Sequence, residues 1–288
     1  MLPSPHIIFT AIEGSLLDPA SRKWSAAEEA LVELERRHVP LILVTGGTRA
    51  QIEPLRSKLG HTQPFITENG SGLFLPDGYF SMKLDGAERM ARYFCVPFAK
   101  DYAAATAALE EIAEEAGASV VGFSQMSPRE IASNTGGPLR EAELAHQRDF
   151  SERFFFAGDA DAAAARFLEV AGKHGWQANP GPAGQPFWEL CSSNGPGRAI
   201  RHLMRLYRTA LHRRLRSYGI GSTAEHLGLL AAVDHPIVLP IHGQEFDGTL
   251  TAGLKHVTRG PESGPMGWNQ TVLDLFQVAE PESQKEGD

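Results

Sequence analysis

The stretch HIIFTAIEGSLLD, residues 6–18, decides the fold. Its first part, His6–Ile12, is short, apolar and β-branched, which predicts a buried strand. Pro40–Thr45 (PLILVT) predicts a second buried strand, and a helix is expected between the two over residues 26–38. The segment GGT, residues 46–48, then turns the chain into another helix. Because right-handed crossovers place such strands side by side, we expect a parallel sheet.

The pattern changes after the second helix. FITENG, residues 65–70, and GLFLP, residues 72–76, predict the two strands of a hairpin. Between residues 96 and 186, helices alternate with short strands, and this order predicts a small inserted α+β domain, which we call the cap. Its expected helices cover 102–116, 161–172 and a segment that starts at Pro128, and its expected strands cover 119–123 and 153–157.

These boundaries give a chain of two domains and a tail. Residues 1–95 and 187–276 are expected to form the core, with Phe187–Cys191 (FWELC) as the strand that re-enters it. One further helix and two further strands complete this core: a helix from Arg198 and strands over 218–221 and 236–240. Residues 277–288 are polar and charged, so we expect them to form a disordered tail.

The composition is that of a globular protein. The chain has 288 residues, is 42% hydrophobic and carries a net charge of -8, which opposes non-specific binding to nucleic acid. An arginine-rich run over 205–216 is more typical of a solvated helix face than of a binding patch. No apolar run approaches the ~20 residues of a membrane span, and no secretory leader is visible. We therefore expect a cytoplasmic protein that binds neither nucleic acid nor membrane, with Cys95 and Cys191 as reduced thiols.

Ligands of an open parallel sheet bind beyond the carboxyl ends of its strands, where loops lead into helices. Four segments of the sequence occupy such places: FTAIEGSLLD at 9–18, LVTGGTR at 43–49, SSNGPGRAI at 192–200 and GIGSTAEHLGLL at 219–230. In this order they resemble the signature motifs of the haloacid-dehalogenase superfamily, and specifically those of its mannosyl-3-phosphoglycerate phosphatase branch.

The resemblance spans nearly the whole chain. It includes segments outside the four motifs: ENG at 68–70, LPDGYF at 75–80, GFSQMSPREIA at 122–132, QRDFSERF at 147–154, GRAIRHLMRLYR at 197–208 and GPMGWN at 264–269. It implies an α/β fold, in which a Rossmann-like parallel-sheet core carries an inserted α+β cap similar to type C2B.

The catalytic residues of the family are replaced in this chain. Members carry D-x-D after the first strand, where the first Asp attacks phosphorus and the second serves as general acid and base. Here those two positions hold Ala11 and Glu13. The Lys of the third motif is matched by Pro196. The metal-binding Asp of the fourth motif is matched by Ser222, and its second acid by His226.

These replacements remove three contributions to phosphatase chemistry at once. The methyl group of Ala11 has no lone pair with which to attack phosphorus, and Pro196 brings no positive charge. Magnesium favours oxygen ligands with carboxylates among them, and neither Ala11 nor Ser222 supplies one. The sequence therefore predicts no metal and no other cofactor, and it marks Ala11, Pro196 and Ser222 as degenerate catalytic positions.

Part of a ligand-binding surface is retained. The resemblance assigns Thr45 to contact phosphate, with backbone N–H groups of Gly46 and Gly47 nearby at a helix start; alternatively, Thr45 only caps that helix. Polar residues of the cap that precede the predicted strand at 153–157 match the substrate face of the family, or are simply the charged end of a helix. The predicted ligand-binding residues are Thr45, Gly46, Gly47, Arg49, Glu68, Asn69, Gln147, Arg148 and Glu152. Arg153 stands where the family pattern has Pro.

Three hypotheses follow. The leading one is a pseudophosphatase that binds a sugar acid, a glycosyl-glycerate, a sugar phosphate or a sugar-metabolic partner protein between core and cap. The second is a re-purposed hydrolase in which Glu13 acts with Glu225 or His226. Such an enzyme would use a glycosidase-like carboxylate pair, for which Glu68 is another candidate, or a transition metal on Glu13 and His226. The third is residual mannosyl-3-phosphoglycerate phosphatase activity.

Overall fold

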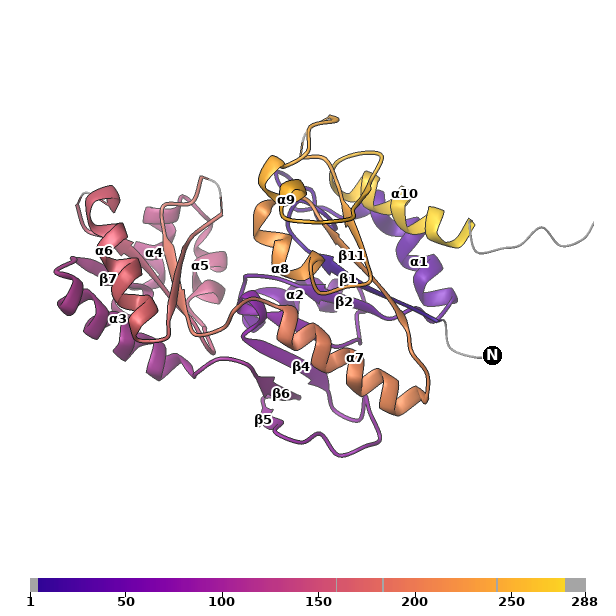
Figure 1. Ribbon diagram of the computed structural model, residues 1–288, viewed down its shortest axis with the longest axis horizontal. Coiled ribbons are helices and arrows are strands. Elements are labelled where there is room, and N and C mark those ends of the chain that lie inside the picture. Colours follow the sequence, from indigo (N-terminus) through magenta and orange to yellow (C-terminus); the bar gives the residue numbers. More distant parts are fainter. Residues whose placement is uncertain (1–4, 159, 183, 242, 278–288) are drawn as a thin grey trace, which may run out of the picture. The chain divides into compact units, whose positions relative to one another are not determined.

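The computed structural model describes residues 5–158, 160–182, 184–241 and 243–277 (Figure 1). The chain packs into two compact units. Met1–Val44 and Met204–Asp288 make up one of them, which we call the terminal unit, and Thr45–Leu203 makes up the other, the central unit. The residues that we expected to form the core are therefore shared between the two units.

A parallel sheet with the strand order β13-β12-β11-β1-β2 forms the centre of the terminal unit. Its strands are β1 (His6–Ala11), β2 (Leu41–Val44), β11 (Arg216–Gly221), β12 (His235–Val238) and β13 (Thr258–Arg259). Every residue of β1 and β2 is buried, because β1 has a neighbour on each edge and its side chains are covered on both faces. The predicted strands and their parallel arrangement are confirmed.

Helices α1 (Glu28–Arg36) and α10 (Gly264–Gln277) lie side by side on this unit (Figure 1). The side chain of Trp268 on α10 is fully buried, and its Nε1 donates a hydrogen bond of 2.9 Å to Oγ1 of Thr10. The next residue, Asn269, accepts a hydrogen bond of 2.8 Å from the backbone N–H of Ala30 in α1. The segment GPMGWN thus fastens α10 both to the central strand and to α1.

Four short helical segments and one long helix complete the description of this part of the chain. The short ones are η1 (Ser25–Ala27), η4 (Ala224–His226), α8 (Leu227–Leu230) and α9 (Gly248–Ala252), and the long one is α7 (Gly197–Leu211), which begins in the central unit. The helix predicted from Arg198 is therefore confirmed. Of the tail expected over 277–288, Gln277 is the last residue of α10, and the rest lies outside the described residues.

The first part of the central unit is antiparallel. After α2 (Arg49–Lys58), four strands follow in the order β3-β4-β6-β5. They are β3 (Phe65–Thr67), β4 (Gly72–Pro76), β5 (Glu88–Met90) and β6 (Tyr93–Pro97). The β3–β4 pair, in which Phe65 lies opposite Phe74, is the predicted hairpin.

The cap is a four-stranded antiparallel sheet with helices on both faces (Figure 1). Its elements are α3 (Tyr102–Ala116), β7 (Val120–Gly122), α4 (Pro128–Thr135), α5 (Leu139–Ala145), β8 (Glu152–Phe156), α6 (Ala160–Lys173), β9 (Gln177–Pro180) and β10 (Trp188–Cys191). Neighbouring residues of β8 point to opposite faces, so Phe154 packs among the side chains of α3 and α6, while Phe155 packs on the side of α4 and α5.

One strand differs from its predicted place. We expected Phe187–Cys191 to re-enter the core, but β10 pairs with β8 on one edge and with β9 on the other. The cap sheet has the order β7-β8-β10-β9 and so extends beyond residue 186. The difference arises because β9, with the polar sequence QANP, gives no apolar strand signal, although it forms an antiparallel hairpin with β10.

A close backbone approach fixes the loop after β3. Gly70 has a φ of +90°, and a Cβ placed on it would lie 2.3 Å from Cα of Pro196, a distance at which two carbon atoms overlap. Pro196 precedes α7, so the segments 68–70 and 195–197 touch without an intervening side chain. Only glycine suits this position.

We predict that Gly70→Ala destabilises the protein far more than Gly60→Ala. Both glycines have a positive φ, but nothing lies within 4 Å of a Cβ at Gly60. Gly60→Ala should therefore show only the cost of a left-handed alanine, about 1–2 kcal/mol, and Gly70→Ala should exceed it by about 2 kcal/mol or more. Urea unfolding of the two variants measures the difference, and equal losses would contradict the close packing.

Candidate ligand-binding site

The carboxyl ends of β1 and β11 lie next to each other in the terminal unit. Ala11 ends β1 and is buried, and Ser222 follows β11 and is buried as well. The turn after β1 passes directly over Ser222, because a Cβ placed on Gly14 would lie 2.9 Å from Oγ of Ser222. Oγ of Ser222 has no hydrogen-bond partner among the described residues. These two degenerate positions therefore offer a methyl group and a hydroxyl group at one edge of the sheet.

The two carboxylates proposed for re-purposed chemistry are both exposed. Glu13 lies in the turn after β1, where it forms a bridge with Leu17, and Glu225 lies in the short helical turn η4. Among the residues that the structure describes, no group of three or more His, Cys, Asp or Glu side chains is placed so that it could hold a metal ion.

His226 closes the loop that contains Ser222. Its Nδ1 accepts hydrogen bonds from the backbone N–H groups of Ser222 (3.0 Å) and Thr223 (3.2 Å). Burial lowers the pKa of His226 from its usual 6.5 to about 4, and the nearby Asp247 carboxylate only partly opposes this. At neutral pH the ring is therefore uncharged, with its proton on Nε2. His226 organises this loop through a neutral ring.

The loop Thr45–Thr48 leads into α2 in the central unit. Oγ1 of Thr45 accepts a hydrogen bond of 2.9 Å from the N–H of Gly47, so this hydroxyl closes the loop. The N-cap of α2 is Thr48, whose Oγ1 accepts from the N–H of Gln51 (3.1 Å) and donates to the carbonyl of Leu144 (2.9 Å). The loop is thus held from within and also touches the cap.

Glu68 anchors the cap segment that leads into β8. Its side chain is fully buried and accepts hydrogen bonds from three successive backbone N–H groups, those of Asp149 (2.8 Å), Phe150 (3.1 Å) and Ser151 (2.8 Å). The hydroxyl of Ser151 donates a fourth, at 2.6 Å. Four donors on one carboxylate satisfy a charge that would otherwise be costly to bury.

Arg148 lies beside Glu68 and is also fully buried. Its guanidinium donates to the carbonyl of Ser151 (2.7 Å) and to Oε2 of Glu189 (2.8 Å), and it lies 3.5 Å from the carboxylate of Glu68. Burial opposes its charge, but the carboxylates of Glu189 and Glu68 outweigh that effect and raise the pKa of Arg148. We call Glu68, Arg148 and Glu189, together with Arg153, the buried charge cluster.

The sequence did not single out Glu189, although it is central to this cluster. Its Oε1 accepts a hydrogen bond of 2.6 Å from Nδ2 of Asn69, and its Oε2 is shared by Arg148 and Arg153. The available signal was a lone carboxylate within the apolar run FWELC, since a charge in a buried strand needs a charged partner.

The remaining predicted ligand-binding residues lie in different settings. Arg49 forms an ion pair of 3.2 Å with Asp149, and Glu152 is buried and accepts from the N–H of Ser124 at 2.8 Å. Gln147 is exposed and donates to the carbonyl of Glu143 at 3.2 Å. The structure thus brings Glu68, Asn69 and Arg148 together through Glu189. Gln147 and Glu152 make their contacts elsewhere in the cap.

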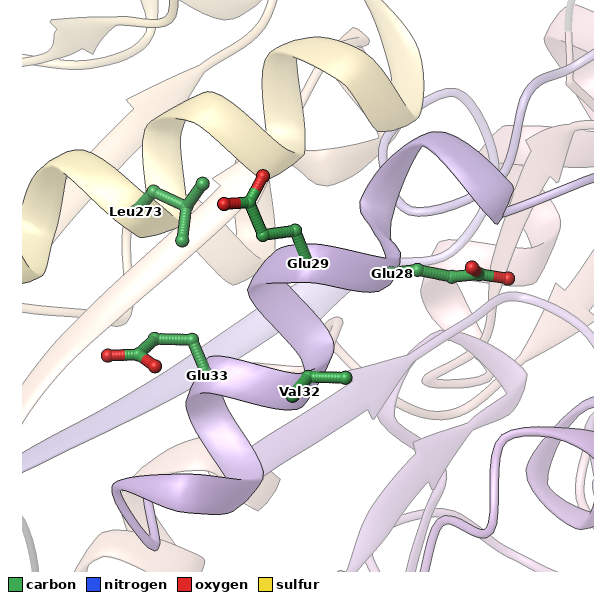
Figure 2. A pocket seen from close by; sticks show the side chains of 5 residues that line it. All are labelled: Glu28, Glu29, Val32, Glu33 and Leu273. Carbon is green, nitrogen blue, oxygen red and sulfur yellow. The ribbon is translucent and has the colours of Figure 1, made fainter.

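A surface hollow lies between α1 and α10, away from all four motifs in sequence (Figure 2). It is lined by Glu28, Glu29, Val32, Glu33 and Leu273. Figure 2 shows Glu29 on the side of α1 that faces Leu273 and Glu28 on the opposite side. The hollow is acidic and open. No helix within the described ranges is both long enough and apolar enough to cross a membrane.

Two curated relatives match this chain over almost its whole length. A glucosyl-3-phosphoglycerate/mannosyl-3-phosphoglycerate phosphatase from Methanococcoides burtonii is 30% identical over 271 residues, which cover 94% of this chain and 97% of the relative. A protein of the same name from Persephonella marina is 27% identical over 276 residues, covering 95% and 98%.

The fold has relatives among solved structures. A sugar phosphatase of haloacid-dehalogenase subclass IIB matches with a TM-score of 0.63 at 13% identity, over 95% of this chain and 98% of the other. At that identity the match concerns the fold alone, an α/β core with a cap. No protein-family model matches the chain.

We predict that Arg148→Met destabilises the protein by roughly 3–5 kcal/mol, because it leaves the buried carboxylates of Glu68 and Glu189 without their shared cation. Arg140→Met is the matched control, since Arg140 is an exposed cap arginine paired with Glu143, and its loss should stay within about 0.5 kcal/mol. Chemical unfolding compares the two variants. If both variants lose a similar free energy of unfolding, the buried charge cluster does not hold the cap segment.

We also predict a pH dependence of stability from His226. In the unfolded chain this ring takes up a proton below pH 6.5, whereas in the folded chain it does so only near pH 4. Its contribution is therefore complete above pH 6.5 and is lost as the pH falls towards 4, by about 3 kcal/mol. His226→Asn, which does not titrate, should lose less stability between pH 7 and pH 4.5. If the free energy of unfolding of both proteins falls by the same amount between pH 7 and pH 4.5, this role of His226 is refuted.

Proposed function

The chain belongs to the glucosyl-3-phosphoglycerate/mannosyl-3-phosphoglycerate phosphatase family of the haloacid-dehalogenase superfamily, and from that premise we propose that it is a pseudophosphatase. It binds a glycosyl-glycerate, a related sugar acid or a sugar phosphate, and it does not cleave the phosphate ester. The two curated relatives carry the activity in their names; this chain keeps the scaffold without the reacting groups.

One observation carries the proposal. The buried positions at the ends of β1 and β11 hold Ala11 and Ser222. A methyl group cannot form a bond to phosphorus, and a neutral serine hydroxyl is a weak nucleophile unless a base activates it. His226 is not placed as that base, because its Nδ1 accepts the N–H of Ser222 and its proton is on Nε2. Among the described residues of this edge, neither Ala11 nor Ser222 combines a nucleophilic atom with an activating base.

The same two positions do not fit the family's magnesium ion. Magnesium demands near-ideal octahedral oxygen ligation and is usually held in proteins by one or two carboxylates. Ala11 has no oxygen in its side chain, and Ser222 offers a neutral hydroxyl beneath the turn at Gly14. The first motif contains two carboxylates, Glu13 and then Asp18, and Glu13 is exposed. The chemistry of this donor set argues for ligand binding without a metal.

Ligand binding is supported by two segments of the central unit whose conformations are held by hydrogen bonds. The Thr45–Thr48 loop is closed by its own hydroxyls, and the cap segment next to it is fixed by Glu68. A preformed surface of this kind loses little conformational entropy when it binds a small molecule. We place the ligand contacts on Thr45, Gly46, Gly47 and Asn69. The alternative ligand is a sugar-metabolic partner protein. In that case, calorimetric titration of this chain with small molecules would give no heat of binding.

The test pairs turnover with binding. We expect calorimetric titration to detect glucosyl- or mannosyl-glycerate or their 3-phosphates. We also expect magnesium-dependent phosphate release to fall at least about 100-fold below that of the Methanococcoides burtonii relative, because even one lost transition-state contact commonly has this effect. Phosphate is measured colorimetrically on protein freed of contaminating phosphatase.

Two outcomes would defeat the proposal. Phosphate release comparable to that of the relative would mean that residual phosphatase activity is intact. Cleavage of the glycosidic bond that disappears in Glu13→Gln would favour the re-purposed hydrolase instead. Glu13→Gln is a suitable variant because the side chain is exposed and its change leaves the packing of β1 intact.

A further inference from the structure

Arg153 reaches from the cap to the loop that precedes α2. Its Nη2 donates a hydrogen bond of 3.1 Å to the backbone carbonyl of Gly46. Its Nε donates to Oε2 of Glu189 at 3.3 Å, and its guanidinium carbon lies 4.4 Å above the ring of Phe187. Three contacts in three directions therefore hold the plane of this guanidinium in one orientation.

These contacts use only part of the hydrogen-bonding capacity of Arg153. A guanidinium has five N–H donors, and the bonds to Glu189 and Gly46 account for Nε and for one donor on Nη2. Among the described residues, Nη1 has no acceptor, and 11% of the side chain stays exposed. The unused donors lie on an oriented fork next to the Thr45–Thr48 loop.

Arg153 remains a cation in this setting. Burial and the neighbouring Arg148 lower its pKa, while Glu189 raises it, and the result is about 10. The side chain is therefore charged at neutral pH. Its charge is only partly balanced, because Oε2 of Glu189 lies closer to Arg148 (2.8 Å) than to Arg153 (3.3 Å).

We propose that Arg153 is a ligand-binding residue, which donates charge-assisted hydrogen bonds to an anionic oxygen of the ligand beside the Thr45–Thr48 loop. The shared chemistry is that of a carboxylate or a phosphate group, since both match the planar fork of an arginine. This inference rests on the proposed function. It adds a cation to the central unit, in which the third motif holds the uncharged Pro196 where the family pattern has Lys.

The experiment measures binding to Arg153→Met, which keeps an unbranched apolar stem and removes the charge and the donors of the guanidinium. Three probes are titrated calorimetrically: inorganic phosphate, the glycosyl-glycerate that the wild-type protein binds, and its 3-phosphate. We expect affinity for at least one anionic group to fall on the order of tenfold or more. If Arg153→Met loses affinity for inorganic phosphate, Arg153 binds the phosphate group. If it loses affinity for the unphosphorylated glycosyl-glycerate, Arg153 binds the carboxylate.

Two further variants separate binding from a purely structural role. Glu189→Gln keeps the shape of that side chain but removes the charge that competes for Arg153, so affinity for the anion should rise severalfold. Arg153→Lys keeps the charge without the fork, and its affinity should lie between those of the wild type and Arg153→Met. These two variants decide the matter if Arg153→Met fails to fold.

Arg166→Met is the matched control, since Arg166 is an exposed cap arginine paired with Glu169, and it should bind like the wild type. If the wild-type protein binds the probes and Arg153→Met binds each of them with the same affinity, the role of Arg153 is overturned and the proposed function still stands. Unchanged or weaker anion binding by Glu189→Gln would also count against it. A wild-type protein that binds none of the probes would instead overturn the proposed function itself.

Discussion

The carboxylate of Glu68 is the point on which the central unit depends. It lies in the loop after β3, with a positive φ of 47°, and it accepts the N–H groups of three consecutive residues, Asp149 to Ser151. Three consecutive N–H groups bonded to one carboxylate fix both the position and the direction of a chain segment. That segment leads directly into β8, the strand that carries Arg153, so the placement of the cap residues over the Thr45–Thr48 loop follows from this one side chain.

The predicted site residues of the terminal unit and those of the central unit differ in their chemistry. In the terminal unit, the edge formed by β1 and β11 carries a methyl group, a hydroxyl group and a neutral imidazole, which together neither attack phosphorus nor hold a magnesium ion. In the central unit, the buried charge cluster is a series of ion pairs: Arg148 lies near both Glu68 and Glu189, and Arg153 lies near Glu189. Under the proposed function, recognition and reaction are separate: the groups proposed to orient a polar ligand lie in the central unit, and the ends of β1 and β11 lack the groups that would change it.

Much of the fold was predictable from the sequence, because buried strands and helix starts leave local signals in it. Continuous apolar runs such as HIIFTAI and LILV are long enough to mark buried strands, and the helix expected from Pro128 is α4. Pairing was less predictable. β10 was expected in the core because the polar strand β9 beside it leaves no apolar signal, and strand partners depend on contacts that local sequence does not contain. Glu189 was missed for the same reason, since its partners lie far away in the chain.

The fastening of α10 has a consequence for the order in which the protein is made. Trp268 supplies the N–H that the hydroxyl of Thr10 accepts, and Asn269 caps the N–H of Ala30. A nascent chain leaves the ribosome from its amino end, so β1 is exposed long before these partners are synthesised. The contacts of Thr45–Leu203 with one another are all available earlier. The residues of the central unit are therefore all synthesised before Trp268 and Asn269, and β1 gains its hydrogen bond to α10 only after that helix has been made.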